Sequence, residues 1–273
     1  EGYEAEKLGI SNCKNVYVIP SVAGYVGGDI VSDLAAVQMH SSELAQSNEK
    51  ETLLLDIGTN GEMVLGKSGK FVCCATAAGP AFEGAEIAKG MPAASGAISK
   101  VWLEDGKICC STIDDAKAIG ICGSGLIVAL AVFLETGLLD ETGLMADADD
   151  VKEAFAGYLG EDEDGTCIWL TDEVKVTQAD VRKLQLAKAS IAAGIQILLE
   201  ERQIAVTDVE QVILAGGFGS FLNKKSAAAI GLIPAELEHV TVSVGNAAGE
   251  GAVSAALSED ARQELRHLQQ EMR

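Results

Sequence analysis

Short apolar runs separated by glycine-rich and polar breaks cover most of the chain. The most regular stretch holds three such runs, at 53–56, 63–65 and 71–74, with turn residues between them. Apolar runs of this length bounded by turn residues are typical of strands, and the short spacing between them favours antiparallel pairing. We therefore expect a three-stranded meander.

Apolar residues three or four positions apart predict a helix at 27–45 and a longer one at 177–202, which begins behind the capping residue Thr177. The same reading gives further helices at 82–88, 126–136, 245–257 and 258–272, and further strands at 16–19, 101–103, 107–110, 211–214 and 239–244. We expect the strands at 211–214 and 241–244 to pair in parallel. A meander followed by alternating helices and strands suits a mixed sheet with helices on both faces.

One segment matches a phosphate-binding pattern by letter. Residues 61–68 satisfy G-x-x-x-x-G-K-S. A true P-loop connects a strand to a helix, so that the helix N-terminus faces the phosphate. Here both the middle of the segment and the residues after Ser68 have the character of strands, so we expect a turn between two strands.

A better candidate for phosphate binding is the turn at 56–60. Gly58 would let the backbone approach a phosphate, and backbone N–H groups of the turn, with the Thr59 hydroxyl, could donate to it. Asp56 would hold Mg²⁺ through water, with Asn60 beside it. Taken alone, the segment fits an ordinary hairpin turn equally well.

Two further glycine clusters stand where a strand gives way to a helix. They are Gly216-Gly217-Phe218-Gly219 and Gly123-Ser124-Gly125. Glycines in the first would let an adenosine lie against the backbone. The alternative for the first is a helix start packed too closely for side chains, and the alternative for the second is a tight turn in which Ser124 caps the helix. A small-residue segment at 244–252 suits a helix in close contact with another element, as at a hinge.

Composition narrows the classes of function. With 20 basic and 41 acidic residues the net charge is −21, and such a surface disfavours nucleic acid as a partner. The hydrophobic content of 48% excludes a disordered acidic chain. No apolar run reaches the roughly 18 residues of a membrane span, and no signal-peptide pattern opens the chain. The seven cysteines have no C-x-x-C spacing, and we expect free thiols in a cytoplasmic protein.

The sequence gives little support for a histidine-based metal site or for a catalytic Ser-His-Asp triad. The three histidines, His40, His239 and His267, are far apart in sequence, and no serine has glycines two positions before and after it. The acidic residues around 147–150 and 161–164 lack the carboxylates that an EF-hand needs at its first and twelfth positions. We expect 140–165 to be a solvated surface segment.

Taken together, these motifs resemble the actin-like ATPase superfamily of acetate and sugar kinases, heat-shock chaperones and actin. The second lobe of these proteins holds a D-x-G-x-T phosphate hairpin, then an adenosine strand, then a small-residue helix. The match is closer to the reductive activators of corrinoid proteins, and it extends from about Val16 almost to the end of the chain. It rests on the segments 56–62, 76–85, 120–127 and 214–219.

The resemblance implies an α/β, RNase-H-like lobe whose mixed sheet has helices on both faces. It implies ATP and Mg²⁺ as cofactors, with Asp56 as the catalytic and metal-binding residue. The implied nucleotide contacts are Gly58, Thr59, Asn60, Gly123, Ser124, Gly125, Gly216, Gly217, Phe218 and Gly219. The implied partner is a corrinoid methyl-transfer protein, which ATP-driven reduction returns from the cob(II) to the cob(I) state, and the implied assembly is a homodimer.

The chain also departs from the family pattern. The iron–sulfur cysteines and the D-x-G-T-T hairpin of the first lobe do not occur in it. We expect residues 1–49 to be the last strand and linking helix of a first lobe and 50–273 to be the second lobe. A [2Fe–2S] cluster is then expected only in a separate N-terminal domain, and this chain alone should bind nucleotide weakly and turn over little ATP. A small-molecule kinase of the same superfamily and a non-catalytic interaction module remain as alternatives.

Overall fold

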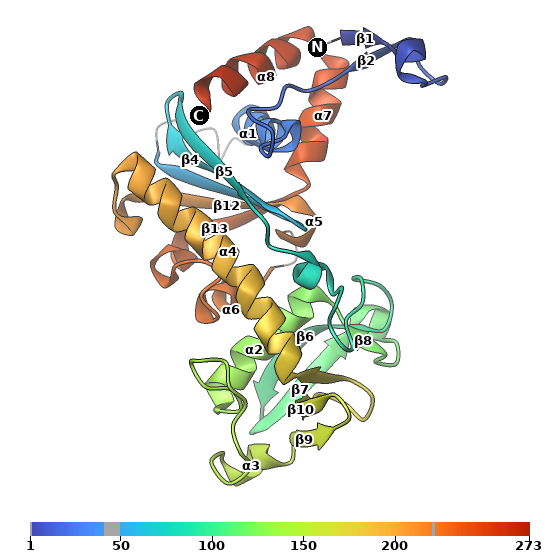
Figure 1. The fold of residues 1–273 in the computed structure, drawn as a ribbon, viewed down its shortest axis with the longest axis vertical. Coiled ribbons are helices and arrows are strands. Elements are labelled where there is room, and N and C mark those ends of the chain that lie inside the picture. Colours follow the sequence, from blue (N-terminus) through green and yellow to red (C-terminus); the bar gives the residue numbers. More distant parts are fainter. Residues whose placement is uncertain (1, 41–49, 220–221) are drawn as a thin grey trace.

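The computed structural model describes residues 2–40, 50–219 and 222–273, and the side chains of Met39, His40 and Phe218 are not described. Figure 1 shows an elongated molecule with two halves. The upper half is built on a five-stranded sheet and the lower half on two three-stranded sheets. The long helix α4 (Gln178–Arg202) runs through both halves and joins them.

The observed elements confirm the mixed α/β order. The strands are β1 (Gly2–Glu4), β2 (Asn15–Tyr17), β3 (Thr52–Ile57), β4 (Gly61–Lys67), β5 (Lys70–Thr76), β6 (Ala97–Glu104), β7 (Lys107–Thr112), β8 (Gly120–Ile121), β9 (Leu159–Asp162), β10 (Gly165–Trp169), β11 (Lys175–Thr177), β12 (Gln211–Ala215) and β13 (Thr241–Gly245). Besides α4, the helices are α1 (Gly28–His40), α2 (Gly123–Thr136), α3 (Glu153–Ala156), α5 (Gly216–Gly219), α6 (Lys224–Ala229), α7 (Ala247–Leu257) and α8 (Glu259–Glu271). Short 3₁₀ helices are η1 (Ala5–Leu8), η3 (Pro80–Glu83), η4 (Ile113–Asp115), η5 (Val206–Asp208) and η6 (Ala235–Val240).

The central sheet has the order β13-β12-β3-β4-β5. Strands β3, β4 and β5 form the predicted antiparallel meander, and β12 pairs in parallel with both β3 and β13. Leu53 and Leu55 of β3 point to one face and Leu54 to the other, because successive side chains of a strand alternate. A strand that is apolar at every position is buried on both faces, which is what the continuous run predicted.

Helices cover both faces of this sheet, as the sequence predicted. On one face α1, α7 and α8 pack in a core that joins Ile30 and Leu265 to Leu54. On the other face α4 places Ile191 in the core with Leu53. The predicted helix at 27–45 is therefore observed as α1 up to His40, and its later residues lie outside the described part. Because α1 shares a core with β3, this helix packs against the sheet of residues 50–273, and the division of the chain into two lobes at residue 49 stays a prediction.

The segment that matches the P-loop pattern is a β-hairpin. Strand β4 pairs with β5 along its whole length, and the turn between them consists of Ser68 and Gly69. Their φ angles are 51° and 72°, the pair of positive values that a two-residue hairpin turn of type I′ requires. No helix begins here to face a phosphate, so the prediction of a turn between strands is confirmed.

One feature of the lower half corrects the sequence analysis, and a second adds detail to it. The predicted helix at 82–88 is instead the 3₁₀ turn η3, which is followed by turns in which Glu86 has a φ of 63°. The stretch 140–165, expected to be a solvated surface segment, is mostly exposed, and it also contains the short elements α3 and β9. Its residues Asp162 and Asp164 both pair with the buried side chain of Lys175, which makes this segment part of a three-stranded sheet with β10 and β11.

Close packing between α1 and α7 depends on Gly251. A Cβ atom at this position would lie 2.3 Å from the backbone oxygen of Ser32. We expect Gly251→Ala to lower the free energy of unfolding by about 1–3 kcal/mol, the usual cost of overpacking, in urea denaturation of the chain. Gly157→Ala is the matched control, because a Cβ there meets no heavy atom within 4 Å and the φ angle of −68° suits alanine. Equal stability of the two variants would contradict this packing.

None of the described helices is long and apolar enough to cross a membrane.

Candidate functional site

The candidate site lies where parallel strands of the central sheet end. Asp56 stands at the carboxyl end of β3, next to Ala215 of β12 in the parallel register and opposite Glu62 of β4. Crevices at the carboxyl ends of parallel strands are the usual ligand sites of α/β sheets, because loops and helix starts converge there. The position of Asp56 therefore agrees with the prediction of a ligand-binding turn.

A second carboxyl group lies beside Asp56, and it comes from helix α1. Asp33 is 0% exposed, and neither of its carboxylate oxygens has a hydrogen-bond donor in good geometry among the described residues. Its neighbours are the side chain of Asp56 and the backbone amide of Ala248 at the start of α7. An uncompensated buried carboxylate is expensive, so this arrangement needs a proton or a cation.

The pKa values reflect this crowding of acids. Burial, together with the neighbouring charge of Asp56, raises the pKa of Asp33 to about 9. Burial also raises the pKa of Asp56. Burial and the charges of Asp29 and Asp56 raise the pKa of Glu62 to about 7. With a pKa of about 9, the Asp33 carboxyl is therefore protonated at neutral pH, and a divalent cation bound between the two acids could take the place of that proton.

Glycine at 216 makes room for Asp56. Gly216 has a φ of 86°, and a Cβ atom there would lie 2.1 Å from Oδ1 of Asp56. By contrast, a Cβ on Gly217 would meet no heavy atom within 4 Å, and one on Gly58 would meet only the Asn60 carbonyl oxygen at 3.9 Å. The backbone at Gly58 and Gly217 is thus open to the approach of a ligand, and N–H groups exposed in this way suit an anion.

The turn that carries Thr59 is held against η3. The Thr59 hydroxyl donates to Oε1 of Glu83 at 2.7 Å, and its carbonyl oxygen accepts from the N–H of Gly79 at 2.9 Å. Inside the turn, the N–H of Gly58 donates to the carbonyl oxygen of Asn60 at 2.8 Å. In this conformation the Thr59 hydroxyl is engaged with a carboxylate, and it would have to turn away to reach a phosphate.

Of the predicted residues near α2 and α5, Ser124 lines a groove, and two of the glycines have packing roles. Ser124, in the first turn of α2, lines a groove of about 750 Å³ together with Leu222 and Asn223, which follow α5. Gly125 has a packing role, since a Cβ there would lie 2.1 Å from the Ile98 carbonyl oxygen. Gly123 is buried beside it in the same turn of α2.

At the end of α5, Gly219 lies close to Leu214, with a Cβ position 3.3 Å from its carbonyl carbon. The side chain of Phe218 lies outside the described residues. The structure thus brings Asp56, Gly58 and Gly216 together at the end of the sheet, and it places Ser124 in a groove with Leu222 and Asn223.

Sequence reasoning missed Asp29, Asp33 and Glu62. A signal for Asp33 was present, because it falls on the buried side of the predicted helix, three residues after Ile30 and four before Val37, and both of these are buried. A carboxylate in an apolar stripe demands a partner or a function. That the partner is Asp56, more than 20 positions away, depends on how α1 packs against β3, and the pattern of residues does not contain this information.

Comparison with known proteins places these features in a family. Residues 50–273 match the family model described as the C-terminal domain of RACo, the ASKHA domain, and residues 2–42 match the RACo middle region. The chain is 36% identical over 262 residues to the corrinoid activation enzyme RamQ of Eubacterium limosum, covering 90% of this chain and 42% of that protein. It is 27% identical over 247 residues to the [Co(II) methylated amine-specific corrinoid protein] reductase of Methanosarcina barkeri, covering 82% of this chain and 41% of that one.

A solved structure gives the same result. The reductive activator for corrinoid, iron–sulfur protein superposes with a TM-score of 0.85 at 36% identity, covering 99% of this chain and 43% of that chain. The chain therefore spans about two fifths of the length of the relatives it matches.

Proposed function

This chain belongs to the family of reductive activators of corrinoid proteins, with the actin-like ATPase fold of the RACo C-terminal ASKHA domain, and from that membership we propose that it supplies half of a Mg²⁺–ATP site that drives the reduction of a corrinoid protein. Its relatives are named as corrinoid activation enzymes and a corrinoid protein reductase. Neither the small-molecule kinase nor the non-catalytic module is therefore proposed.

The observation that carries this proposal is the buried pair Asp33–Asp56 beside open glycine backbone. Among the residues that the structure describes, neither oxygen of Asp33 has a hydrogen-bond donor in good geometry, and Gly58 and Gly217 leave free space next to the acids. Magnesium is usually held by one or two carboxylates together with phosphates and waters, so these residues fit a Mg²⁺–nucleotide. A charge arrangement that is unfavourable in the empty site favours binding of the cation, because binding relieves it.

Each residue then has a definite task. Asp56 and Asp33 would hold Mg²⁺, and Gly216 keeps the space that the Asp56 carboxylate occupies. The N–H groups of Asn60 and Gly217 would face the phosphates, whereas the N–H of Gly58 already donates to the carbonyl oxygen of Asn60. When bound, ATP would supply the phosphoryl group and Mg²⁺ would neutralise its charge, because phosphoryl transfer depends on positioning and charge stabilisation.

Catalysis is proposed to need more than this chain provides. Orientation of the reacting groups can lower the activation barrier by roughly 7–11 kcal/mol. A site that holds the nucleotide from only one side loses much of this contribution. We propose that residues of a first lobe complete the cleft, so that this chain alone binds nucleotide and turns it over slowly.

A [2Fe–2S] cluster is proposed to lie outside the described residues. Among those residues, no group of three or more His, Cys, Asp or Glu side chains is arranged to hold a metal ion. The partner is proposed to be a corrinoid protein, and the location the cytoplasm. Support for the location comes from the seven cysteines, which are all free thiols.

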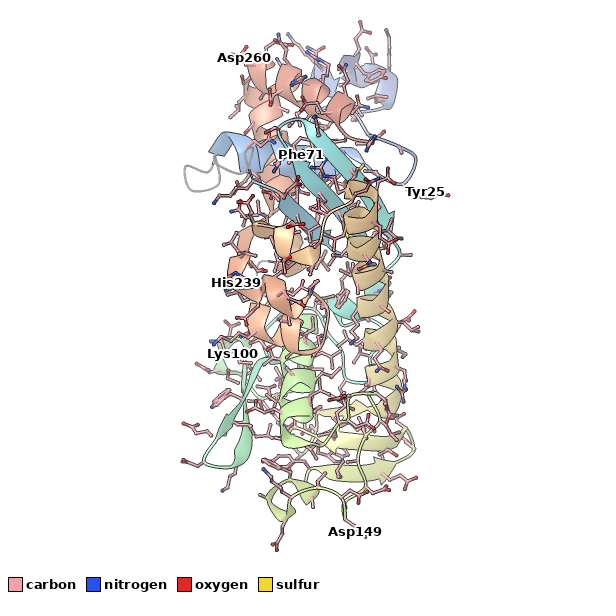
Figure 2. The ribbon with its side chains drawn as sticks, turned by 90° about the vertical axis from the view of Figure 1, so that its left-hand side faces the viewer. Tyr25, Phe71, Lys100, Asp149, His239 and Asp260 are labelled. Carbon is pink, nitrogen blue, oxygen red and sulfur yellow. The ribbon has the colours of Figure 1, made fainter. Side chains whose placement is uncertain are left out.

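The experiment that tests this function is equilibrium dialysis of the chain with ATP, with and without Mg²⁺. We expect weak binding that requires Mg²⁺ and that falls at least tenfold in Asp56→Ala. Asp149→Asn is the control, because Asp149 lies at the far end of the lower half, at the bottom of Figure 2. Mg²⁺-independent binding, or equal binding by both variants, would argue against the site.

The homodimer is also a proposal, and its support is an apolar stripe on α4. Leu186 is 74% and Ile197 is 58% exposed, and Ala189 and Ala193 lie between them at helical spacing. Figure 2 shows α4 along one edge of the molecule for its whole length. We propose that a second copy covers this stripe, since apolar residues that share one helix face seldom stay in water.

We expect Leu186→Glu combined with Ile197→Glu to convert a dimer into a monomer in sedimentation at micromolar concentration. Leu257→Glu is the control, because Leu257 is 83% exposed at the end of α7, which covers the opposite face of the central sheet from α4. A wild-type chain that sediments as a monomer, or a double variant that remains dimeric, would exclude this interface.

A further inference from the structure

The segment that follows β5 contains the family motif at 76–85, and none of its residues belongs to the acidic pair. Figure 1 shows the chain passing from β5 into the short turn η3 where the two halves of the molecule meet. From η3, Oε1 of Glu83 accepts the Thr59 hydroxyl at 2.7 Å, across 24 positions of the sequence. The motif therefore places a carboxylate on a side chain of the proposed phosphate turn.

The backbone that carries Glu83 is held in place on several sides. Phe82 is 1% exposed and packs in the core below η3. η3 ends at Gly84, where a φ of 78° turns the chain and a Cβ atom would lie 2.6 Å from a neighbouring backbone oxygen. Further along, the N–H of Ala88 donates to Oδ1 of Asp180 in α4 at 2.9 Å. A change at the contact with Thr59 is therefore expected in the Thr59 side chain and not in η3.

The Thr59 hydroxyl can change its partner by rotation about one bond, while the backbone of its turn stays in place. The Gly79 N–H donates to the Thr59 carbonyl oxygen at 2.9 Å, and the Gly58 N–H donates to the Asn60 carbonyl oxygen at 2.8 Å. The turn thus keeps these bonds without the side chain. A hydroxyl has one donor hydrogen, so it donates either to the Glu83 carboxylate or to a phosphate oxygen. The two acceptors compete for the same hydrogen.

The charge of the Glu83 carboxylate strengthens this competition. Hydrogen bonds to ionised acceptors are stronger than bonds to neutral ones, so the contact with Thr59 resists exchange. A carboxylate also repels a phosphate that approaches the same hydroxyl, since both are negative. Because Thr59 and Glu83 are both exposed, water and salt weaken these effects, and changes of several-fold in affinity are expected.

We propose that Glu83 competes with the phosphates of the nucleotide for the Thr59 hydroxyl and thereby lowers the affinity of the site for phosphate. Glu83 is then a positioning residue: it holds the hydroxyl away from an incoming phosphate, and it releases the hydroxyl when a phosphate oxygen becomes the acceptor. The exchange replaces one hydrogen-bond acceptor by another, and no covalent bond changes. The inference rests on the proposed Mg²⁺–ATP function and adds to it a residue that sets phosphate affinity.

Substitutions of Glu83 test this competition with inorganic tripolyphosphate and Mg²⁺ in equilibrium dialysis. Glu83→Gln keeps an acceptor of the same shape without the charge, and Glu83→Ala removes the acceptor as well. We expect both variants to bind tripolyphosphate about fivefold more tightly than the wild type, because the Thr59 hydroxyl is released more easily. Glu86→Gln is the matched control and should bind as the wild type does. Glu86 is exposed in the turns after η3, and it meets the Lys183 ammonium through its backbone oxygen.

A double-mutant cycle with Thr59→Val supplies a readout that general repulsion would not move. Valine has nearly the shape of threonine without the hydroxyl, and we expect Thr59→Val alone to weaken tripolyphosphate binding about threefold. In the Thr59→Val background, Glu83→Gln should tighten binding by less than about twofold, since no hydroxyl remains for the two acceptors to share. An equal gain in both backgrounds would mean that Glu83 acts by charge alone, and the inference would be overturned.

The outcomes also separate this inference from the function on which it rests. Because the substituted side chains are exposed, each variant should keep the wild-type stability in urea denaturation. If the wild type binds Mg²⁺–ATP and tripolyphosphate but both Glu83 variants bind them equally or more weakly, Glu83 supports the turn, the inference is wrong and the Mg²⁺–ATP site stands. If neither ligand binds to the wild type or to any variant, both proposals fail.

Discussion

Replacing Asp33 by Asn should raise the free energy of unfolding of this chain by about 2–4 kcal/mol at pH 8. The carboxyl of Asp33 is fully buried against Asp56, and its surroundings raise its pKa from the ordinary 3.8 to about 9. Between these two pKa values the folded state keeps a proton on Asp33 that the unfolded state has released. Each pH unit in this range therefore lowers the free energy of unfolding. An asparagine removes this penalty, and its amide can donate to Asp56.

The sign of the pH dependence follows from the same values. Below pH 3.8 the Asp33 carboxyl is protonated in both states and contributes nothing. As pH rises from about 4 toward 9, the unfolded state binds fewer protons than the folded state, and the wild type loses stability. The raised pKa values of Asp56 and Glu62 add to the same slope.

Urea denaturation at pH 5 and pH 8 measures this effect. Asp33→Asn should show a smaller loss of stability between the two pH values than the wild type, and Asp149→Asn should behave as the wild type does. A variant Asp33→Asn that is less stable than the wild type at pH 8 would mean that the carboxylate has a stabilising partner. A gain in stability joined to a loss of Mg²⁺–ATP binding is the expected signature of a functional acid.

Alanine substitutions at Gly216 and Gly217 should give the second large effect, on nucleotide affinity and stability, and the two variants serve as a matched pair. Gly216→Ala should lower the affinity for Mg²⁺–ATP at least a hundredfold and destabilise the chain by about 1–3 kcal/mol, since the new Cβ would lie 2.1 Å from Oδ1 of Asp56 at a φ of 86°. Gly217→Ala should leave stability within about 0.5 kcal/mol, because a Cβ there meets no heavy atom within 4 Å. It should nevertheless weaken nucleotide binding, since the methyl group would occupy the open space beside the acids.

Dialysis and denaturation of both variants measure these outcomes. If Gly217→Ala binds Mg²⁺–ATP as tightly as the wild type does, the ligand does not approach the backbone at this residue, and the proposed phosphate position is wrong. If Gly216→Ala retains both stability and binding, the Asp56 carboxylate is free to move, and its fixed position does not determine affinity.

The central sheet could be predicted from sequence because its signals are local. Leu53–Leu55 form an uninterrupted apolar run, and the turn at Ser68 and Gly69 has residues that accept positive φ angles. The cap of α4 is equally local, since the Thr177 hydroxyl accepts from the N–H of Asp180. These features depend on residues that are neighbours in the chain.

The features that sequence reasoning missed depend on contacts between distant residues. The acidic residues at 162 and 164 lie on the surface as their charge suggests, but their ion pairs with the buried Lys175 could not be predicted from the sequence. The turns after η3 replace a predicted helix where the backbone fits closely to its surroundings, as at Gly84, whose Cβ position lies 2.6 Å from the Met91 carbonyl oxygen. Asp56 was predicted from its motif, but Asp33 joins it only through the packing of α1 on the sheet.

Reduction of the corrinoid protein from cob(II) to cob(I) by the full-length activator, with and without ATP, is the most direct measurement. We expect Asp56→Asn to lower the ATP-dependent rate at least a hundredfold, while reduction of the [2Fe–2S] cluster by a chemical reductant and binding of the corrinoid protein stay unchanged. Asp149→Asn should retain the wild-type rate. If Asp56→Asn also retains the ATP-dependent rate, the acids at the end of β3 do not serve the nucleotide, and the proposed function of this chain is wrong.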